Sequence, residues 1–412
     1  MGKVISFICL FLALLTIEQF AQGNLIEKLL KENPDKFGEV LSKIDSFEVQ
    51  IIYTQINRDR NNFPSFKTYN YRVNPKDYFY AASTVKLPTA LMALEKLNNL
   101  KIKELDKYTP LRIDSARAPQ TKVTADTSSE SGLPTIANYI KKIFLVSDND
   151  AFCRLYEFVG QRELNEGLHK KGYKNVKITN RYTGGFNSES NRYTNPFTFY
   201  YGDKIIYSQP EQYNSNDYSF NLNGLIKGIG YWDSKDSLIN APYDFSAKNF
   251  VSLENLTEIL KTVLFPETRK AKTRFNLTND DYRFLYKYMS MLPKESKHPG
   301  YDTTHYDSYV KYFMFGNSKK PIPSNIRIFN KVGMAYGYLT DIAYIVDFEN
   351  KIEFMLSAVI HVNKDQIYND GIYEYDKIGM PFLANVGKVI YDFEKSRTKK
   401  YLPNLSKFKI DY

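Results

Sequence analysis

The sequence predicts an α/β sandwich in which an antiparallel sheet, built from both ends of the chain, is flanked by helices and carries an inserted all-helical subdomain. Runs with the two-residue alternation of strands lie near both ends, at 47–56 and 326–362. Between them, apolar residues recur at helical spacing, as in 134–159 and 253–264. The two ends must therefore meet in one sheet, and we expect the functional site where this sheet meets the helices.

The individual elements follow from local patterns. Residues 25–44 have helical spacing interrupted near Pro34, and 69–73 is expected to pair with the strand at 47–56. A helix starting at Ser83 presents an apolar stripe of Leu87, Leu91, Leu94 and Leu97. The later elements are expected in this order: two helices within 134–159 separated at 147–150, helices at 253–264 and 280–292, strands at 326–331, 340–348 and 352–362, and a closing helix at 374–394.

The first 23 residues are typical of a secretory signal. Lys3 supplies a positive end, an apolar run covers 4–15, and small residues follow at a suitable place for cleavage. The apolar run is too short for a membrane span, and no later segment is longer and equally apolar. We therefore expect an exported protein, periplasmic or secreted, with no transmembrane segment in its mature form.

The mature chain, 24–412, is predicted to form a single catalytic domain. Its sheet subdomain comprises about 46–80 and 322–412, and its helical subdomain about 83–320. Within the latter, about 197–248 is rich in Tyr, Asn and Ser and has the character of an insertion.

Composition excludes several function classes. The formal net charge is +10, but the basic residues are dispersed among acidic ones, which does not favour nucleic acid as a partner. Cys153 is the only cysteine after the signal, so no internal disulfide is expected, and its apolar neighbours indicate a core position. No His, Cys and Asp cluster has metal-ligand spacing, and the sequence requires no metal or cofactor.

The first chemical motif is Ser83-x-x-Lys86. Positions three apart lie on one face of a helix, so the lysine amine can reach the serine hydroxyl. A desolvated lysine can accept the proton of a serine and make it nucleophilic without a histidine. Taken alone, Ser83 has a simpler interpretation as a helix N-cap, with Lys86 as a solvated helix residue.

Two further motifs follow along the chain. Ser147-Asp148-Asn149 falls at the break between two predicted helices, and Lys331-Val332-Gly333 falls in a predicted strand. Separately, the first is compatible with a plain helix start and the second with a strand end.

In this order and at these separations, the three motifs resemble those of the serine β-lactamase and D-alanyl-D-alanine peptidase superfamily, closest to its class A branch. The resemblance implies that Ser83 attacks the carbonyl of a β-lactam or of a D-Ala-D-Ala cell-wall peptide and becomes acylated. It implies that Lys86 takes up the Ser83 proton, that Ser147 relays a proton to the leaving nitrogen, and that Lys331 adds positive potential.

The resemblance also implies three substrate-binding positions. Asn149 would hold the substrate amide, and Gly333 would lie in the strand beside the substrate. The backbone N–H groups of Ser83 and Met334 would stabilise the oxyanion.

Two features depart from the class A pattern. Class A enzymes carry a deacylating glutamate where this chain has Asn180, and Glu189 is the only carboxylate in the loop 181–196. Glu189 is therefore either the deacylation base or a solvated loop residue. Val332 replaces a substrate-binding hydroxyl residue, and Asp341 stands where some class A enzymes have a carboxylate-binding arginine.

Three functions are compatible with these residues. The first is a class A-type hydrolase of β-lactams or a related amide. The second is a cell-wall D,D-peptidase, or penicillin-binding protein, on which β-lactams remain attached. The third is a non-catalytic sensor module on the same fold.

Overall fold

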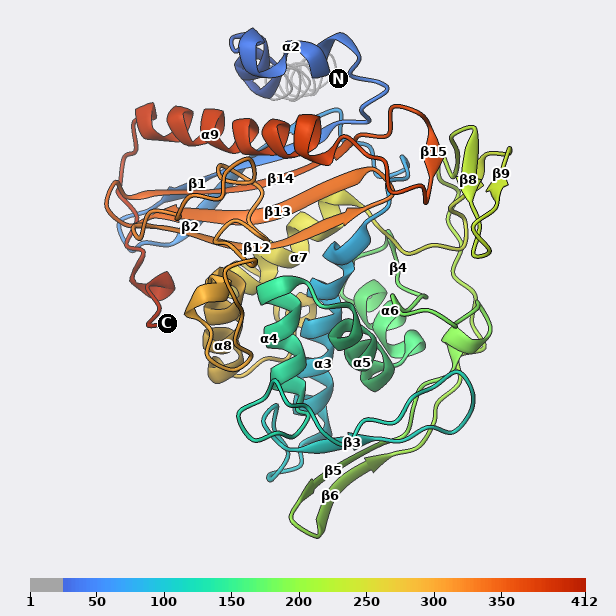
Figure 1. The fold of residues 1–412 in the computed structure, drawn as a ribbon. Coiled ribbons are helices and arrows are strands. Elements are labelled where there is room, and N and C mark those ends of the chain that lie inside the picture. Colours follow the sequence, from blue (N-terminus) through green and yellow to red (C-terminus); the bar gives the residue numbers. More distant parts are fainter. Residues whose placement is uncertain (1–24) are drawn as a thin grey trace, which may run out of the picture.

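The two ends of the chain meet in one antiparallel sheet, as predicted (Figure 1). The computed structural model describes residues 25–412, so the predicted export signal lies outside the described residues. The N-terminal strand β1 pairs with β14, with Gln50 opposite Val359. The sheet has the strand order β12-β13-β14-β1-β2, with the bounds Ile326–Ala335, Tyr338–Asp347, Ile352–His361, Gln50–Arg58 and Pro64–Tyr71.

Helices from both ends of the chain cover one face of this sheet. The residues 25–31 are helical and are followed by α2 (Pro34–Ser42), which packs against α9 (Met380–Ser396) (Figure 1). The rings of Phe37 and Phe382 meet edge to face at 5.8 Å between centroids. Successive residues of β1 face opposite sides of the sheet, and both faces of the strand are buried from Gln50 to Ile56.

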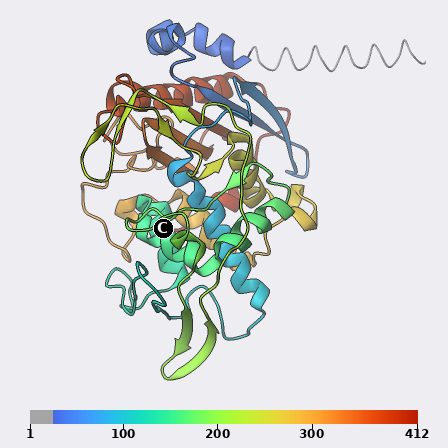
Figure 2. The same cartoon turned by 90° about the vertical axis from the view of Figure 1, so that its right-hand side faces the viewer.

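The middle of the chain packs against the other face. Thr257, on α7, donates a hydrogen bond of 2.8 Å to the Ser357 hydroxyl of β14. Helix α3 runs through the centre of this layer and is buried from Lys86 to Leu97 (Figure 2). The helices of the layer are α3 (Lys86–Leu100), α4 (Ile136–Val146), α5 (Asn149–Val159), α6 (Gln161–Lys170), α7 (Leu253–Leu264) and α8 (Asn279–Ser290).

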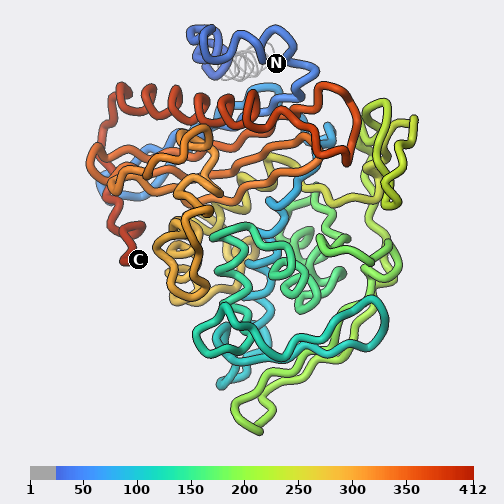
Figure 3. The backbone as a smooth tube through the Cα atoms, in the orientation of Figure 1, coloured from blue at the N-terminus to red at the C-terminus, as the bar shows by residue number. Residues whose placement is uncertain are grey.

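The middle part of the chain also contains short strands, several of them in the segment 197–248. Strands β5 and β6 form a hairpin that pairs with β3, and β8 pairs with β15 from the C-terminal part of the chain. The segment 197–248 therefore runs along the helices and reaches the edge of the main sheet (Figures 1 and 3). The short strands are β3 (Leu111–Ile113), β4 (Val176–Lys177), β5 (Phe197–Tyr201), β6 (Lys204–Gln209), β7 (Ile226–Lys227), β8 (Gly230–Trp232), β9 (Leu238–Ile239), β10 (Tyr243–Asp244), β11 (Phe250–Val251) and β15 (Ile367–Tyr368).

Within residues 25–412, no helix combines the length and apolar character that crossing a lipid bilayer requires.

A buried ion pair ties the hairpin β1–β2 to the far end of β14. Both Glu353 oxygens accept from the Arg58 guanidinium, at 2.6 and 2.7 Å, and the Tyr344 hydroxyl donates to the same carboxylate at 2.7 Å. The two charged side chains are 5% and 1% exposed, so neither can replace its partner by water.

We predict that Glu353→Ala lowers the free energy of unfolding by about 3–5 kcal/mol, because it leaves Arg58 buried without its counter-ion. Urea unfolding measures the change. Glu349→Ala, at an exposed position just before β14, is the matched control and should change stability by less than about 0.5 kcal/mol. Equal effects of the two substitutions would show that the ion pair contributes no more than a surface charge.

Candidate active site

Ser83 lies in a strained turn rather than within the predicted helix. Residues Ala82–Val85 form a 3-10 turn, and the regular helix α3 begins only at Lys86. Ala82 has φ of 44°, in the left-handed region that non-glycine residues rarely adopt. The Tyr182 hydroxyl donates to the Ala82 carbonyl at 2.6 Å and holds this conformation. The turn thus fixes the backbone direction immediately before the serine.

Strand β12 touches this turn through a glycine. A Cβ atom at Gly333 would lie 2.7 Å from the Ala81 carbonyl oxygen and 3.2 Å from the Ser83 nitrogen. No side chain fits in such a space, which explains why glycine follows Lys331-Val332. The next residue, Met334, has a side chain that is 47% exposed. The backbones around Ser83 and Met334 therefore run side by side at the protein surface.

Lys86 is completely buried and turns away from solvent. Its amine donates to the Ser147 carbonyl and to Asn149 Oδ1, the latter at 2.7 Å, and lies 3.5 Å from the Ser147 hydroxyl. Burial lowers the pKa of Lys86 to about 7, although the nearby Asp148 carboxylate opposes the change. The amine is therefore largely able to act as a base at neutral pH.

Lys331, on β12 of the sheet, also contacts Ser147. Its amine donates to the Ser147 hydroxyl at 2.7 Å and to the Val332 carbonyl at 2.8 Å. Burial, reinforced by the neighbouring Lys86, holds the pKa of Lys331 well below its usual range. Ser147 itself ends α4 with φ of 61°, which presents its hydroxyl and carbonyl to the two lysines.

The three sequence motifs thus meet at Ser147. The Ser83 hydroxyl makes no hydrogen bond to Lys86 or to any other group of residues 25–412, and it is only partly buried. In this arrangement, the Lys86 amine is hydrogen-bonded to residues of the second motif, and the Ser83 hydroxyl is available to bind a ligand.

Asp341, which stands where some class A enzymes have an arginine, belongs to a buried hydrogen-bond network. It is fully buried, and its carboxylate accepts from the Asn330 amide at 2.8 Å and from the backbone N–H groups of Tyr312 and Phe313. Burial raises the pKa of Asp341 and lowers that of nearby Lys311. Asp341 lies on β13 opposite Val332, and its bond to Asn330 fixes the residue that precedes Lys331.

The loop 181–196 brings no carboxylate into contact with the motifs. Glu189 is 61% exposed at its side chain and pairs with Arg192 at 3.7 Å. Asn180 donates through its side chain to the Ala247 carbonyl at 2.6 Å. The loop is anchored instead by Arg181, which is ion-paired with a buried glutamate of α5 at 2.8 Å.

Tyr182 is a site residue that the sequence did not reveal. Besides its bond to Ala82, its ring lies 5.6 Å from the Lys86 amine. One tyrosine among 34 carries no signal of its own, and only the folded loop shows that it supports both Ser83 and Lys86.

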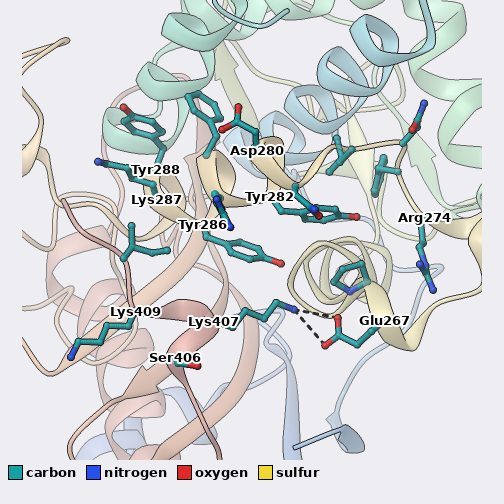
Figure 4. A pocket seen from close by; sticks show the side chains of 18 of the residues that line it. Glu267, Arg274, Asp280, Tyr282, Tyr286, Lys287, Tyr288, Ser406, Lys407 and Lys409 are labelled. Carbon is teal, nitrogen blue, oxygen red and sulfur yellow. Dashed lines mark hydrogen bonds and ion pairs between the residues drawn. The ribbon is translucent and has the colours of Figure 1, made fainter. Parts of the chain in front are cut away.

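A cavity of about 1400 Å³ lies away from these motifs, between α8 and the C-terminal segment (Figure 4). Tyr282 and Tyr286 of α8 line it, and Lys407 forms an ion pair with Glu267 at 3.2 Å across it. None of the three motifs contributes a lining residue. The cavity is therefore separate from the candidate active site.

A family model matches the part of the chain that carries the first two motifs. Residues 36–203 match the model of the Beta-lactamase2 family, described as a beta-lactamase enzyme family. This segment contains Ser83, Lys86 and the element 147–149. The resemblance noted in the sequence is thus confirmed, and it supports a hydrolase of the serine β-lactamase kind. No curated protein sequence matches the chain.

Solved structures with a similar fold include several of these enzymes. A beta-lactamase from Sphaerobacter thermophilus DSM 20745 has 12% identity and a TM-score of 0.48, over 91% of this chain and 98% of that chain. A structure titled PBP-A has 13% identity and a TM-score of 0.48, over 90% and 96%. A class A beta-lactamase from Clostridium kluyveri DSM 555 has 15% identity and a TM-score of 0.46, over 88% and 98%.

We predict that Gly333→Ala lowers the free energy of unfolding by about 1–3 kcal/mol, since its methyl group would press on the Ala81 carbonyl and the Ser83 nitrogen. Thermal or urea unfolding measures this. Gly184→Ala is the control, because no atom lies within 4 Å of a Cβ there and its φ is not positive. A Gly333→Ala protein as stable as the Gly184→Ala protein would contradict the close approach of β12.

Proposed function

We propose that this protein is an exported serine hydrolase that forms an acyl-enzyme on Ser83 with a β-lactam or a related amide. The Ser83 oxygen attacks the carbonyl carbon, and its proton passes to the neutral Lys86 amine. When the C–N bond breaks, the leaving nitrogen takes a proton through the Ser147 hydroxyl, which Lys86 and Lys331 both approach. Water then releases the acyl group as a carboxylic acid and restores the Ser83 hydroxyl.

The observation that carries this proposal is the buried pair of lysines at Ser147. A lysine whose pKa is about 7 can take a proton at neutral pH, whereas a solvated one cannot. Lys331 donates a hydrogen bond to the Ser147 hydroxyl and so orients the relay, and the backbone N–H groups of Ser83 and Met334 are the proposed oxyanion donors. Asn149, already bonded to Lys86, is the proposed partner of the substrate amide.

A second candidate function is a D,D-peptidase or penicillin-binding protein acting on cell-wall peptides. It is favoured by two features: Asn180, just before the loop 181–196, stands at the position of the class A glutamate, and Glu189 within the loop faces solvent. A slow final hydrolysis would leave β-lactams attached to Ser83. The lifetime of the acyl-enzyme therefore separates the two candidates.

We predict that benzylpenicillin adds its full mass to the protein and that Ser83→Ala abolishes the addition. Intact-mass spectrometry followed over time measures both attachment and release. Ser188→Ala, in the exposed part of the loop, is the control and should be labelled like the unmodified protein. Release within seconds supports the hydrolase, and an adduct that persists for many minutes supports the peptidase. Labelling that survives Ser83→Ala contradicts both.

We predict that the acylation rate rises as the pH is raised towards 7 and levels off above it. Lys86 must lose its proton to accept that of Ser83, and its pKa is about 7. Lys86→Arg should lower the rate about 100-fold or more at every pH, since a guanidinium keeps its proton. Stopped-flow acylation by a chromogenic cephalosporin gives the profile. A rate that is flat from pH 5 to 9 would exclude Lys86 as the base.

A further inference from the structure

An isolated cation lies at the edge of the candidate active site. Lys248, at the end of the segment 197–248, places its amine 5.5 Å from the centroid of the Tyr243 ring and 5.4 Å from that of Tyr336. Its side chain is half-buried. Among residues 25–412, no carboxylate lies within ion-pair distance of this amine. A positive charge is thus held by two aromatic rings with no anion beside it.

Contacts between rings connect this cation to the strained turn at Ser83. Tyr336 directly follows the last residue of β12, three residues after Gly333, and meets the Tyr80 ring edge to face, at 4.9 Å between centroids. Tyr80 precedes Ser83 by three residues and is buried. The rings of Tyr336 and Tyr80 thus connect Lys248 to the segment that immediately precedes Ser83.

Lys248 and the proton relay contact the segment 331–336 on either side of Gly333, the residue that touches the Ser83 turn. Along β12, Lys331 contacts Ser147, Gly333 contacts the Ser83 turn, and the following Tyr336 contacts Lys248. A strand rises about 3.3 Å per residue, which separates the backbones at Lys331 and Tyr336 by roughly 15 Å. Because Ser147 serves the leaving group in the proposed reaction, a group near Lys248 belongs to the acyl part of the substrate.

We propose that Lys248, held by Tyr243 and Tyr336, binds an anionic group in the acyl part of the substrate. This inference rests on the proposed function and adds a substrate class to it, namely acyl donors with a carboxylate on the side of the carbonyl that stays attached to Ser83. Because residue 332 is a valine, the motif 331–333 lacks the hydroxyl that usually helps to bind a substrate carboxylate. Lys248 supplies a positive charge at a different position.

The test uses two p-nitrophenyl esters with the same leaving group, one of 4-carboxyphenylacetic acid and one of 4-carbamoylphenylacetic acid. Release of p-nitrophenolate, corrected for that of Ser83→Ala, gives the two second-order rates and their ratio. We expect the full-length protein to prefer the carboxylate ester about tenfold, and Lys248→Met to reduce this preference to about one. Methionine keeps the unbranched stem against the two rings while removing the charge.

Lys235→Met is the matched control, because Lys235 is an exposed lysine in the same segment, without an ion pair among the described residues, and its loss changes the net charge equally. It should leave the ratio unchanged, and Lys248→Arg should retain at least half of the preference. An unaltered ratio in Lys248→Met, or an equal fall in Lys235→Met, would overturn the inference.

A separate measurement distinguishes failure of this inference from failure of the proposed function. The primary amides of the same two acyl groups are titrated calorimetrically into Ser83→Ala and into Ser83→Ala/Lys248→Met. If neither ester reacts at Ser83, the proposed function fails, yet a carboxylate-bearing amide that binds about tenfold more tightly when Lys248 is present still supports the anion site. Equal affinities in the two proteins would overturn it.

Discussion

The candidate site depends on two lysine amines that are buried around one serine. Lys86 and Lys331 both reach Ser147, and neither has a carboxylate partner among the described residues. Removing an ammonium group from water costs free energy. Because no carboxylate of residues 25–412 pairs with either amine, burial favours the neutral form and lowers the pKa of both lysines. A base at neutral pH is therefore a consequence of packing: the helix layer and the sheet together bury Lys86 and Lys331.

The sheet and the helix layer depend on each other at this point. Gly333 lets β12 press against the turn before Ser83, and Tyr182 holds the same turn from the loop side. The left-handed backbone at Ala82 is maintained by these contacts and would relax in a separate helix layer. Ser83 is thus placed by elements from three distant parts of the chain.

The sequence predicted the sheet and the three motifs because their patterns are local. Alternation identifies β1, a run rich in strand-forming residues identifies β14, and the motif spacings identify Ser83, Ser147 and Lys331. It did not predict strands such as β8, because two or three residues carry no periodicity and pair with segments far along the chain. Tyr182 and Lys248 were missed for a related reason, since their roles arise only from tertiary contacts in a chain that is rich in both residue types.

The position of β1 has a consequence for how the chain is assembled. This strand lies between β2, its hairpin partner, and β14, which is made some 300 residues later. The N-terminal hairpin must therefore wait until nearly all of the polypeptide has been synthesised before its second edge is covered. Such distant pairing slows folding and leaves an apolar strand edge open to other molecules in the meantime. Maturation of this protein is expected to be sensitive to crowding and to chaperones that cover strand edges.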